Sequence, residues 1–265
     1  MLFRSVASWI AGQNDILELF RNGMDEYKNF ASSALYNVPY ENVTKDMRQV
    51  SKSAVLGCMF GQGARGLVEY ADGMGVKLTP TESDKAVKAY RTKYAKVKSA
   101  WYDFEAQAIN AINVPGTAFR SGKVVFKVAR DALWMQLPSG RLICWRHPQV
   151  EKQLTPWGAM KDGITVFNQN TFTRKWGRNK LIGSSIFQSA VQATARDMLT
   201  EAMLSLEHNG YSVLNCIHDE ILLLVPEAEG EKALQQVLAL MTKPPKWSPD
   251  FPLAAEGWVD SRYRK

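Results

Sequence analysis

The sequence predicts an α+β protein in which a helical lobe, residues 1–115, precedes a lobe of antiparallel strands and packed helices, residues 116–265, with a cleft between them. Apolar residues recur at helical spacing up to about residue 112. After Pro115 the sequence changes to short segments in which apolar and polar residues alternate, separated by glycine and proline turns. Finally, the segment NCIHDEILLLVP, residues 215–226, places three ionisable residues between two apolar runs of strand length.

The first helices are short. Residues 4–11 form one, and Asn14 is expected to cap the next, which ends at residues 22–23. A third helix is broken at residues 37–39, because the residue before a proline avoids helical backbone angles. Its apolar residues at helical spacing are Tyr27, Phe30, Ala31, Ala34 and Leu35.

The most informative helix follows Thr44, its expected cap, in TKDMRQVSKSAVLGCMFG. Arg48, Lys52, Leu56 and Phe60 recur every four residues and lie along one slowly rotating stripe. Like charges one turn apart repel by a few tenths of a kcal/mol, so an anion would relieve them. A triphosphate fits, because arginine offers a bidentate fork and lysine a point charge. An exposed basic face explains the same spacing, and the spacing alone favours that simpler interpretation.

The glycines of the next segment, FGQGARG, indicate a bend rather than a Walker loop, because no GKS or GKT follows. A connector then leads to one long predicted helix at about residues 83–112, whose apolar positions alternate by three and four. Its basic residues gather in the first half, where a solvated face is at least as consistent as phosphate contacts. They are Lys85, Lys88, Arg91, Lys93, Lys96 and Lys98.

Strands are predicted at residues 117–128 and 132–145, and an irregular stretch from Arg146 to about Trp176. A strong amphipathic helix follows in IFQSAVQATARDMLTEAMLSLEHNG. Gln188 and Gln192 lie one turn apart near its start. Their side-chain amides could donate hydrogen bonds to a ligand, or they could simply be exposed to solvent. The sequence pattern is consistent with both.

That helix leads into two predicted strands that meet at His218, Asp219 and Glu220, and a final helix follows at about residues 228–242. Two carboxylates beside apolar strands are costly to desolvate unless a cation or a donor satisfies them. Mg²⁺ is a natural partner, because it is often held by one or two carboxylates together with phosphate oxygens. A solvated acidic turn is an equally consistent interpretation of the segment alone.

The composition narrows the class of protein. The 265 residues carry 33 Lys and Arg against 26 Asp and Glu, which gives a net charge of +7 and weakly favours polyanionic partners. Three dispersed cysteines form no CxxC pair, which excludes a disulfide framework and favours a reducing compartment. Three histidines are too few for a His-rich metal site. No apolar run approaches the roughly 20 residues of a membrane span, so no membrane partner is expected.

Taken together and in order, these segments resemble the family A DNA polymerases, the DNA polymerase I group, and most closely its bacteriophage members. RQVSKSAVLGCMFG resembles motif B of the fingers helix, and CIHDEILLLVP resembles motif C of the palm hairpin. LPSGRL, FQSAVQATARDML and FPLAAEGW are also phage-like, and DILELFRNGMDEYKNFAS matches the segment before motif B. The resemblance covers essentially the whole chain and implies the fingers and C-terminal palm of an incomplete polymerase right hand.

The resemblance implies a role for each residue on the stripe. Arg48 and Lys52 would bind the phosphates of an incoming deoxynucleoside triphosphate, and Lys52 would protonate the leaving pyrophosphate. Phe60 stands where tyrosine usually stacks near the templating base. Leu56 replaces the Phe or Tyr that normally governs tolerance for 3′-deoxy sugars, which puts that behaviour in doubt.

In the palm, the resemblance implies that Asp219 binds the catalytic Mg²⁺ ions and that Glu220 supports it. His218 would contact the primer end. Gln188 occupies a usual Asn position, and Gln192 matches a Gln that contacts primer–template DNA in the minor groove. The reaction would be attack of a primer 3′-hydroxyl on an α-phosphate, assisted by two metal ions.

One part of the family pattern is missing. Aligning Trp9 with the phage pattern places the Asp of motif A three or four residues before Met1, so the second metal-binding carboxylate lies outside this chain. We therefore expect negligible activity from this chain alone, and an N-terminal polymerase fragment that carries motif A and the thumb as its partner. The expected location is the cytoplasm of a phage-infected or prophage-bearing bacterium. The alternatives are a catalytically inactive nucleotide- or nucleic-acid-binding remnant or accessory protein, and a metal-dependent nuclease.

Overall fold

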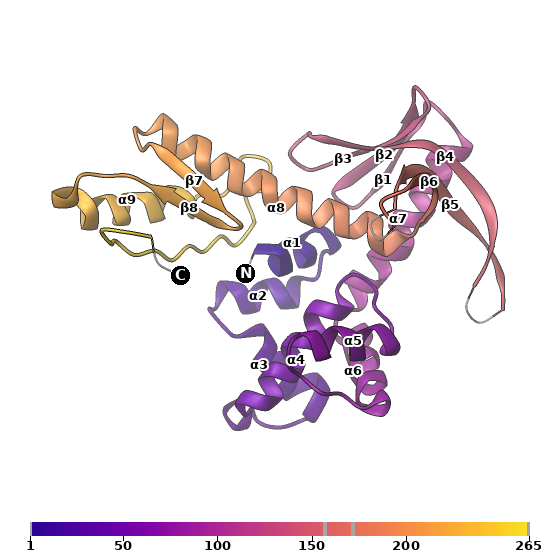
Figure 1. Cartoon of the computed structure of the whole chain (residues 1–265), viewed down its shortest axis with the longest axis horizontal. Coiled ribbons are helices and arrows are strands. Elements are labelled where there is room, and N and C mark those ends of the chain that lie inside the picture. Colours follow the sequence, from indigo (N-terminus) through magenta and orange to yellow (C-terminus); the bar gives the residue numbers. More distant parts are fainter. Residues whose placement is uncertain (1, 156–157, 171–172, 264–265) are drawn as a thin grey trace.

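The computed structural model describes residues 2–155, 158–170 and 173–263. One long helix, α8, runs from a curled antiparallel sheet at one end of the molecule to a small β-hairpin at the other, and the N-terminal helices lie beneath its middle (Figure 1). This mixture of helices and antiparallel strands confirms the predicted α+β class. No helix in the described part of the chain combines the length and apolarity that crossing a membrane requires.

Seven α-helices precede the sheet within the described residues, and two short turns of π- and 3₁₀-helix join α3 to α4. The helices are α1 (Leu2–Ala11), α2 (Asn14–Arg21), α3 (Glu26–Phe30), α4 (Lys45–Cys58), α5 (Ala64–Gly73), α6 (Pro80–Lys93) and α7 (Ala95–Asn113). The π-helical turn is η1 (Ala31–Tyr36) and the 3₁₀ turn is η2 (Tyr40–Asn42). The predicted cap at Thr44 is confirmed, because its hydroxyl accepts a hydrogen bond from the backbone N–H of Met47 at 3.2 Å.

The single long helix predicted over residues 83–112 is wrong, because the chain breaks at Tyr94 with φ −104° and ψ 47°. Gln13 satisfies backbone groups on both sides of the break: its amide donates to the carbonyl of Lys93 at 3.4 Å and accepts from the N–H of Lys96 at 3.0 Å. Because α2 begins at Asn14, Gln13 and not the predicted Asn14 occupies its N-cap position, without a capping hydrogen bond from its side chain. Both halves keep helical periodicity, so the sequence pattern did not reveal the break.

The sheet is a six-stranded antiparallel meander in chain order. Its strands are β1 (Ala118–Ser121), β2 (Val124–Ala129), β3 (Ala132–Gln136), β4 (Leu142–Leu154), β5 (Met160–Gln169) and β6 (Trp176–Leu181). The predicted irregular stretch from Arg146 to Trp176 is therefore wrong. A bulge between Arg146 and Gln149 accommodates Pro148, so the strand continues past a residue that cannot donate to the ladder. Pro156, which also suggested irregularity, lies outside the described residues.

The inner face of the sheet packs on α7, and α7 in turn packs on α8. Phe104 of α7 lies between Phe126 of β2 and Phe187 of α8, with ring centroids 5.6 and 5.5 Å apart. A Cβ at Gly183 would lie 1.9 Å from the carbonyl oxygen of Trp101, so glycine lets α7 and α8 approach closely. The division into lobes at residues 115 and 116 stays a prediction, and one continuous core contains buried residues from both sides of it.

The predicted acidic hairpin is present. After α8 (Gly183–His208), β7 (Val213–Ile217) pairs with β8 (Glu220–Leu223), and the turn η3 (Glu227–Glu229) leads into α9 (Gly230–Met241). Helix α9 packs on α8, which supports the hairpin.

Candidate functional site

The predicted stripe on α4 lies at the surface of the N-terminal helices. Arg48, Lys52, Leu56 and Phe60 are all half-buried, while the opposite side of the helix, including Ala54, is buried in the core. A stripe that is neither core nor fully solvated has the exposure of a ligand-facing surface. The helix repeat places Arg48, Lys52 and Leu56 on one side of α4, and Phe60 lies in the turn that follows the end of the helix at Cys58.

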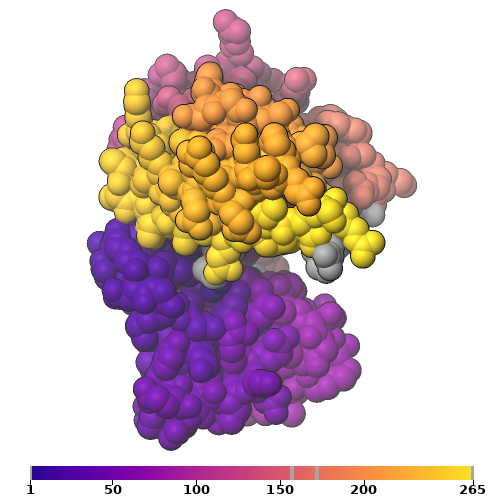
Figure 2. Space-filling model, turned by 90° about the vertical axis from the view of Figure 1, so that its left-hand side faces the viewer, coloured from indigo at the N-terminus to yellow at the C-terminus, as the bar shows by residue number. Residues whose placement is uncertain are grey.

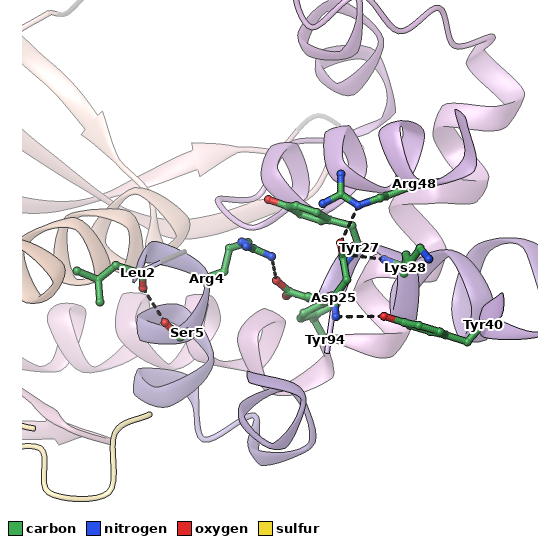
Figure 3. Close-up of polar contacts among 10 residues, drawn as sticks. Leu2, Arg4, Ser5, Asp25, Tyr27, Lys28, Tyr40, Arg48 and Tyr94 are labelled. Atoms are coloured by element: carbon green, nitrogen blue, oxygen red, sulfur yellow. Dashed lines mark hydrogen bonds and ion pairs between the residues drawn. The ribbon is translucent and has the colours of Figure 1, made fainter. Parts of the chain in front are cut away.

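Arg48 is held by a residue that the sequence analysis missed. Its Nε lies 2.7 Å from Oδ2 of Asp25, and its guanidinium lies 5.4 Å from the ring centroid of Tyr27 (Figure 3). Asp25 is the N-cap of α3 and accepts from the N–H groups of Tyr27 and Lys28 at 2.9 and 3.1 Å. An Asp immediately before a short helical pattern is a recognisable cap signal, but its partner 23 residues away is not visible in the sequence.

The carboxyl of Asp25 is held in its charged form. Partial burial opposes its ionisation, but hydrogen bonds from Arg48 and from the backbone N–H groups of Lys28 and Tyr27 outweigh burial and lower the pKa of Asp25. An anionic ligand at Arg48 would therefore meet a guanidinium that is already oriented by a carboxylate. Lys52, one turn further along, has no ion-pair partner among the described residues.

A second, buried network lies behind the first. Glu26 accepts from Arg4 of α1 at 2.6 Å and from the hydroxyl of Tyr94 at 2.8 Å (Figure 3). Burial raises the pKa of Glu26 above its ordinary range, although Arg4 and Tyr94 oppose that shift. The guanidinium of Arg4 also lies 4.2 Å from the ring centroid of Tyr27, so this ring contacts cations from both networks. The two networks join α1, α3, α4 and the break between α6 and α7 at Tyr94.

The C-terminal end of α4 lies against the start of α8. Gly61 has φ +89°, and a Cβ there would lie 2.7 Å from the side chain of Ser184. This contact brings Phe60 toward the first turns of α8, where Gln188 is half-buried and Gln192 is exposed. Neither amide has a hydrogen-bond partner within the part of the chain that the structure describes.

The other end of α8 anchors the hairpin. The turn between β7 and β8 has two residues, His218 with φ 58° and the exposed Asp219. Glu220 opens β8 and accepts a hydrogen bond from the hydroxyl of Tyr263 at 2.9 Å. From α8, Arg196 donates to Sγ of Cys216 at 3.3 Å.

The structure does not bring all the predicted residues into contact. Helix α4 packs on α3, α5 and α6, whereas β7 packs on β8 and α8. Helix α8 links them, because Ser184 at its start lies against Gly61, which follows α4, and Arg196 further along donates a hydrogen bond to Cys216 of β7. On the face shown in Figure 2, a notch opens between the yellow C-terminal segment and the purple helices, while the indigo N-terminal helices touch the C-terminal part.

The hairpin by itself offers few metal ligands. Searching the described residues finds no group of three or more His, Cys, Asp or Glu side chains placed to hold an ion. Asp219 and Glu220 nevertheless supply the one or two carboxylates with which Mg²⁺ is commonly bound when substrate phosphates complete its coordination. The residues present therefore fit part of a magnesium site.

Comparison with known proteins gives consistent results. A model of the family "DNA polymerase family A" matches residues 4–125. The chain is 33% identical to the DNA polymerase of Bacillus phage SP02 over 98% of its own length and 39% of the relative. It is 24% identical to DNA polymerase I of Aquifex aeolicus (strain VF5), over 94% of this chain and 35% of that protein.

The fold matches as well. The POL domain of Pol1 from M. smegmatis, solved in complex with DNA primer-template and dNTP, aligns with a TM-score of 0.58 at 17% identity. That alignment covers 92% of this chain and 35% of the other. The chain thus spans well under half the length of each of these three proteins.

Proposed function

We propose, from the premise that the chain belongs to DNA polymerase family A, that it forms the fingers and part of the palm of a DNA-directed DNA polymerase. The reaction is transfer of a nucleotide from a deoxynucleoside triphosphate to a primer 3′-hydroxyl, directed by a template strand. Residues 1–115 would form the fingers and residues 116–265 the palm portion with its acidic hairpin. This polymerase would work in the cytoplasm of a bacterium that carries the phage or prophage.

The observation that best supports this proposal is the half-buried stripe on α4. Arg48 and Lys52 lie one turn apart, and Asp25 orients the guanidinium of Arg48 without neutralising Lys52. In the proposed complex both cations bind the triphosphate, and Lys52 donates the proton that the leaving pyrophosphate needs. Leu56 and Phe60 extend the stripe toward α8, where the sugar and the templating base would pack.

The proposed palm site uses the hairpin. Asp219 would hold Mg²⁺ with support from Glu220, and the metal would stabilise negative charge on the phosphate oxygens. A site for two ions requires a further carboxylate opposite Asp219. We propose that a segment carrying motif A supplies it, either from a partner fragment or from upstream in a longer chain. The exposed Leu214 and Leu224 beside the hairpin, at 68% and 72%, offer that segment apolar surface.

The proposed DNA contacts follow α8. His218 would contact the primer end, and Gln188 and Gln192 would donate to primer–template DNA in the minor groove. Their amides suit this role because they have no hydrogen-bond partner among the described residues.

Binding of a fluorescent deoxynucleoside triphosphate with Mg²⁺ tests the proposal. Lys52→Ala should weaken binding by about tenfold or more, because it removes a charge-assisted contact. Asp219→Ala should weaken the magnesium-dependent part of the affinity. Lys88→Ala is the matched control, since Lys88 is an exposed lysine on α6 whose partner is Asp84. Equal affinities for all four proteins would exclude a nucleotide site here.

Primer extension separates the catalytic claim from the binding claim. The chain alone should extend a primer negligibly, and adding the motif A and thumb segment should restore extension. Robust extension by this chain alone would show that the second carboxylate is not needed from outside.

An inactive accessory protein is the second candidate, favoured by the lack of a three-ligand metal group among the described residues. It predicts DNA binding that is indifferent to Asp219→Ala and Lys52→Ala, and no extension even with the added segment. A nuclease would instead degrade DNA with Mg²⁺ in the absence of nucleotides.

A further inference from the structure

Within the part of the chain that the structure describes, the outer face of the β1–β6 sheet is left uncovered. Helix α7 packs on the inner face, which carries buried residues such as Phe126, Leu133 and Val166. In an antiparallel sheet, directly paired residues point to the same side. The pairs Phe167↔Arg178 and Gln169↔Trp176 therefore place the side chains of Phe167 and Trp176 on the outer face, as their exposure confirms.

Aromatic rings form a row on this face. Trp176 is 65% exposed and Phe167 is 41% exposed, and their rings stack with centroids 6.0 Å apart at 29°. The bulge in β4 gives His147 a positive φ and brings its ring to 6.1 Å from Phe167 in an edge-on arrangement. Large rings left in water on a sheet supply stacking surface at low entropic cost, because each has only two side-chain torsions.

The same face is strongly basic. The pairing register and exposure place five cations on it: Arg120, Lys127, Arg146, Arg178 and Lys180. Arg130, in the turn between β2 and β3, joins them because it lines the same concavity as Lys127. Two carboxylates lie beside them, and both have partners. Asp131 pairs with His147, and Glu151 accepts from the hydroxyl of Thr165 at 3.0 Å. The face therefore attracts polyanions.

A shallow concavity of about 450 Å³ continues the row toward β1. Trp134, Lys127, Arg130 and Leu142 line it. It is open to solvent and has aromatic, cationic and apolar walls, so it can take a base together with its phosphate.

We propose that this outer face, the sheet platform of His147, Phe167 and Trp176 with its surrounding cations, binds single-stranded DNA. Bases would stack on Phe167 and Trp176, and phosphates would lie against Arg146 and Lys180. Stacking platforms combined with a basic surface are how proteins bind single strands without reading their sequence. The platform lies on the side of the sheet opposite α7, and α4 and the hairpin pack on other elements. The proposal is therefore independent of the proposed polymerase function.

Fluorescence anisotropy with a labelled oligothymidylate of about 20 nucleotides tests the platform in the whole chain. At about 50 mM salt, Trp176→Ala and Phe167→Ala should each weaken binding by about tenfold, the usual contribution of a stacked base. Trp176→Phe should retain affinity within about threefold, because any aromatic face supports stacking. Tyr102→Ala is the matched control, since Tyr102 is 61% exposed but lies on α7.

The salt dependence of binding tests the role of the cations on the outer face. The double variant Arg146→Ala and Lys180→Ala should reduce the slope of log affinity against log salt by about 0.7 for each lost phosphate contact. Replacing Lys85 and Lys88 of α6 should leave the slope unchanged. Magnesium-dependent nucleotide binding should stay at the parent value in all the platform variants, so failure of the platform is distinguishable from failure of the nucleotide site.

Three results would overturn the proposal. The first is equal affinity for the parent, Trp176→Ala and Phe167→Ala. The second is binding of a blunt duplex as tightly as the single strand, which would indicate attraction to the charge alone. The third is tight binding of polyglutamate that depends on the same aromatics while the oligothymidylate does not bind, which would assign the face to an acidic protein segment.

Discussion

The buried ion pair between Arg4 and Glu26 should be among the most sensitive sites in the molecule. The side chain of Glu26 is fully buried and that of Arg4 is 11% exposed. Arg4 and Tyr94 both donate to the carboxylate of Glu26, and Arg4→Ala would leave it only the hydroxyl of Tyr94 from this pair. Breaking a buried pair from one side costs about 3–5 kcal/mol, because the remaining charge is desolvated without compensation. For a chain of this size that loss lowers the Tm by about 6–10 °C.

The effect should depend on pH, with a defined sign. Burial raises the folded-state pKa of Glu26, so the folded protein binds more protons than the unfolded chain. The stability from this group is present below its ordinary pKa and is lost as pH rises through the folded pKa. Arg4 opposes the shift, so Arg4→Ala raises the pKa of Glu26 further. The variant should therefore be more destabilised near pH 8 than near pH 5.

Chemical denaturation at both pH values, followed by circular dichroism, measures these free energies of unfolding. Adding Glu26→Gln to Arg4→Ala should recover part of the loss near pH 8, since the amide carries no charge to desolvate. Arg65→Ala is the control, because its pair with Glu69 is exposed and should contribute under about 0.5 kcal/mol. A cost below about 1 kcal/mol for Arg4→Ala, or the same cost at both pH values, would refute this reasoning.

Three further predictions concern packing, capping and cysteine chemistry. Gly183→Ala should lower the free energy of unfolding, measured by chemical denaturation, by about 3 kcal/mol or more, because its Cβ would overlap a backbone carbonyl of α7. Gly73→Ala is the control: its Cβ would have no atom within 4 Å, so the change should be neutral or stabilising. Thr44→Ala should cost about 1 kcal/mol by the same measurement, because the cap of α4 is lost, and an unchanged midpoint would contradict that role. Burial raises the pKa of the Cys58 thiol to about 12, so a thiol reagent at about pH 8 should label the exposed Cys144 and spare Cys58 until the protein unfolds. Labelling of both at equal rates would mean that Cys58 is accessible in the native state.

Several elements could be predicted because their signals are local. Thr44 caps α4, and the helix repeat alone places Arg48, Lys52 and Leu56 on one side of it, whereas Phe60 follows the end of the helix. The hairpin around Asp219 was predicted in the same way, from two apolar runs separated by a short polar turn. The order of these motifs along the chain was enough to indicate the family.

Other elements were missed because their causes are distant in the sequence. The break at Tyr94 depends on Gln13, more than 80 residues away, which satisfies the backbone groups that the break exposes. The strands after Arg146 were missed for two reasons. The bulge around Pro148 interrupts the alternation of apolar and polar residues in β4, and most residues of β6 are polar and exposed.

By itself the sequence determined the phase of α4, its cap at Thr44, the acidic hairpin and the resemblance to the family A DNA polymerases, because each follows from residues within a few positions of one another or from the order of motifs. Only the tertiary structure decided that Asp25 orients Arg48, that Glu26 is buried between Arg4 and Tyr94, and that Trp176 stacks on Phe167 on an open, basic face. Such pairings join side chains from separate elements. They are set by how those elements pack, and packing depends on the shape of the whole core rather than on any local pattern.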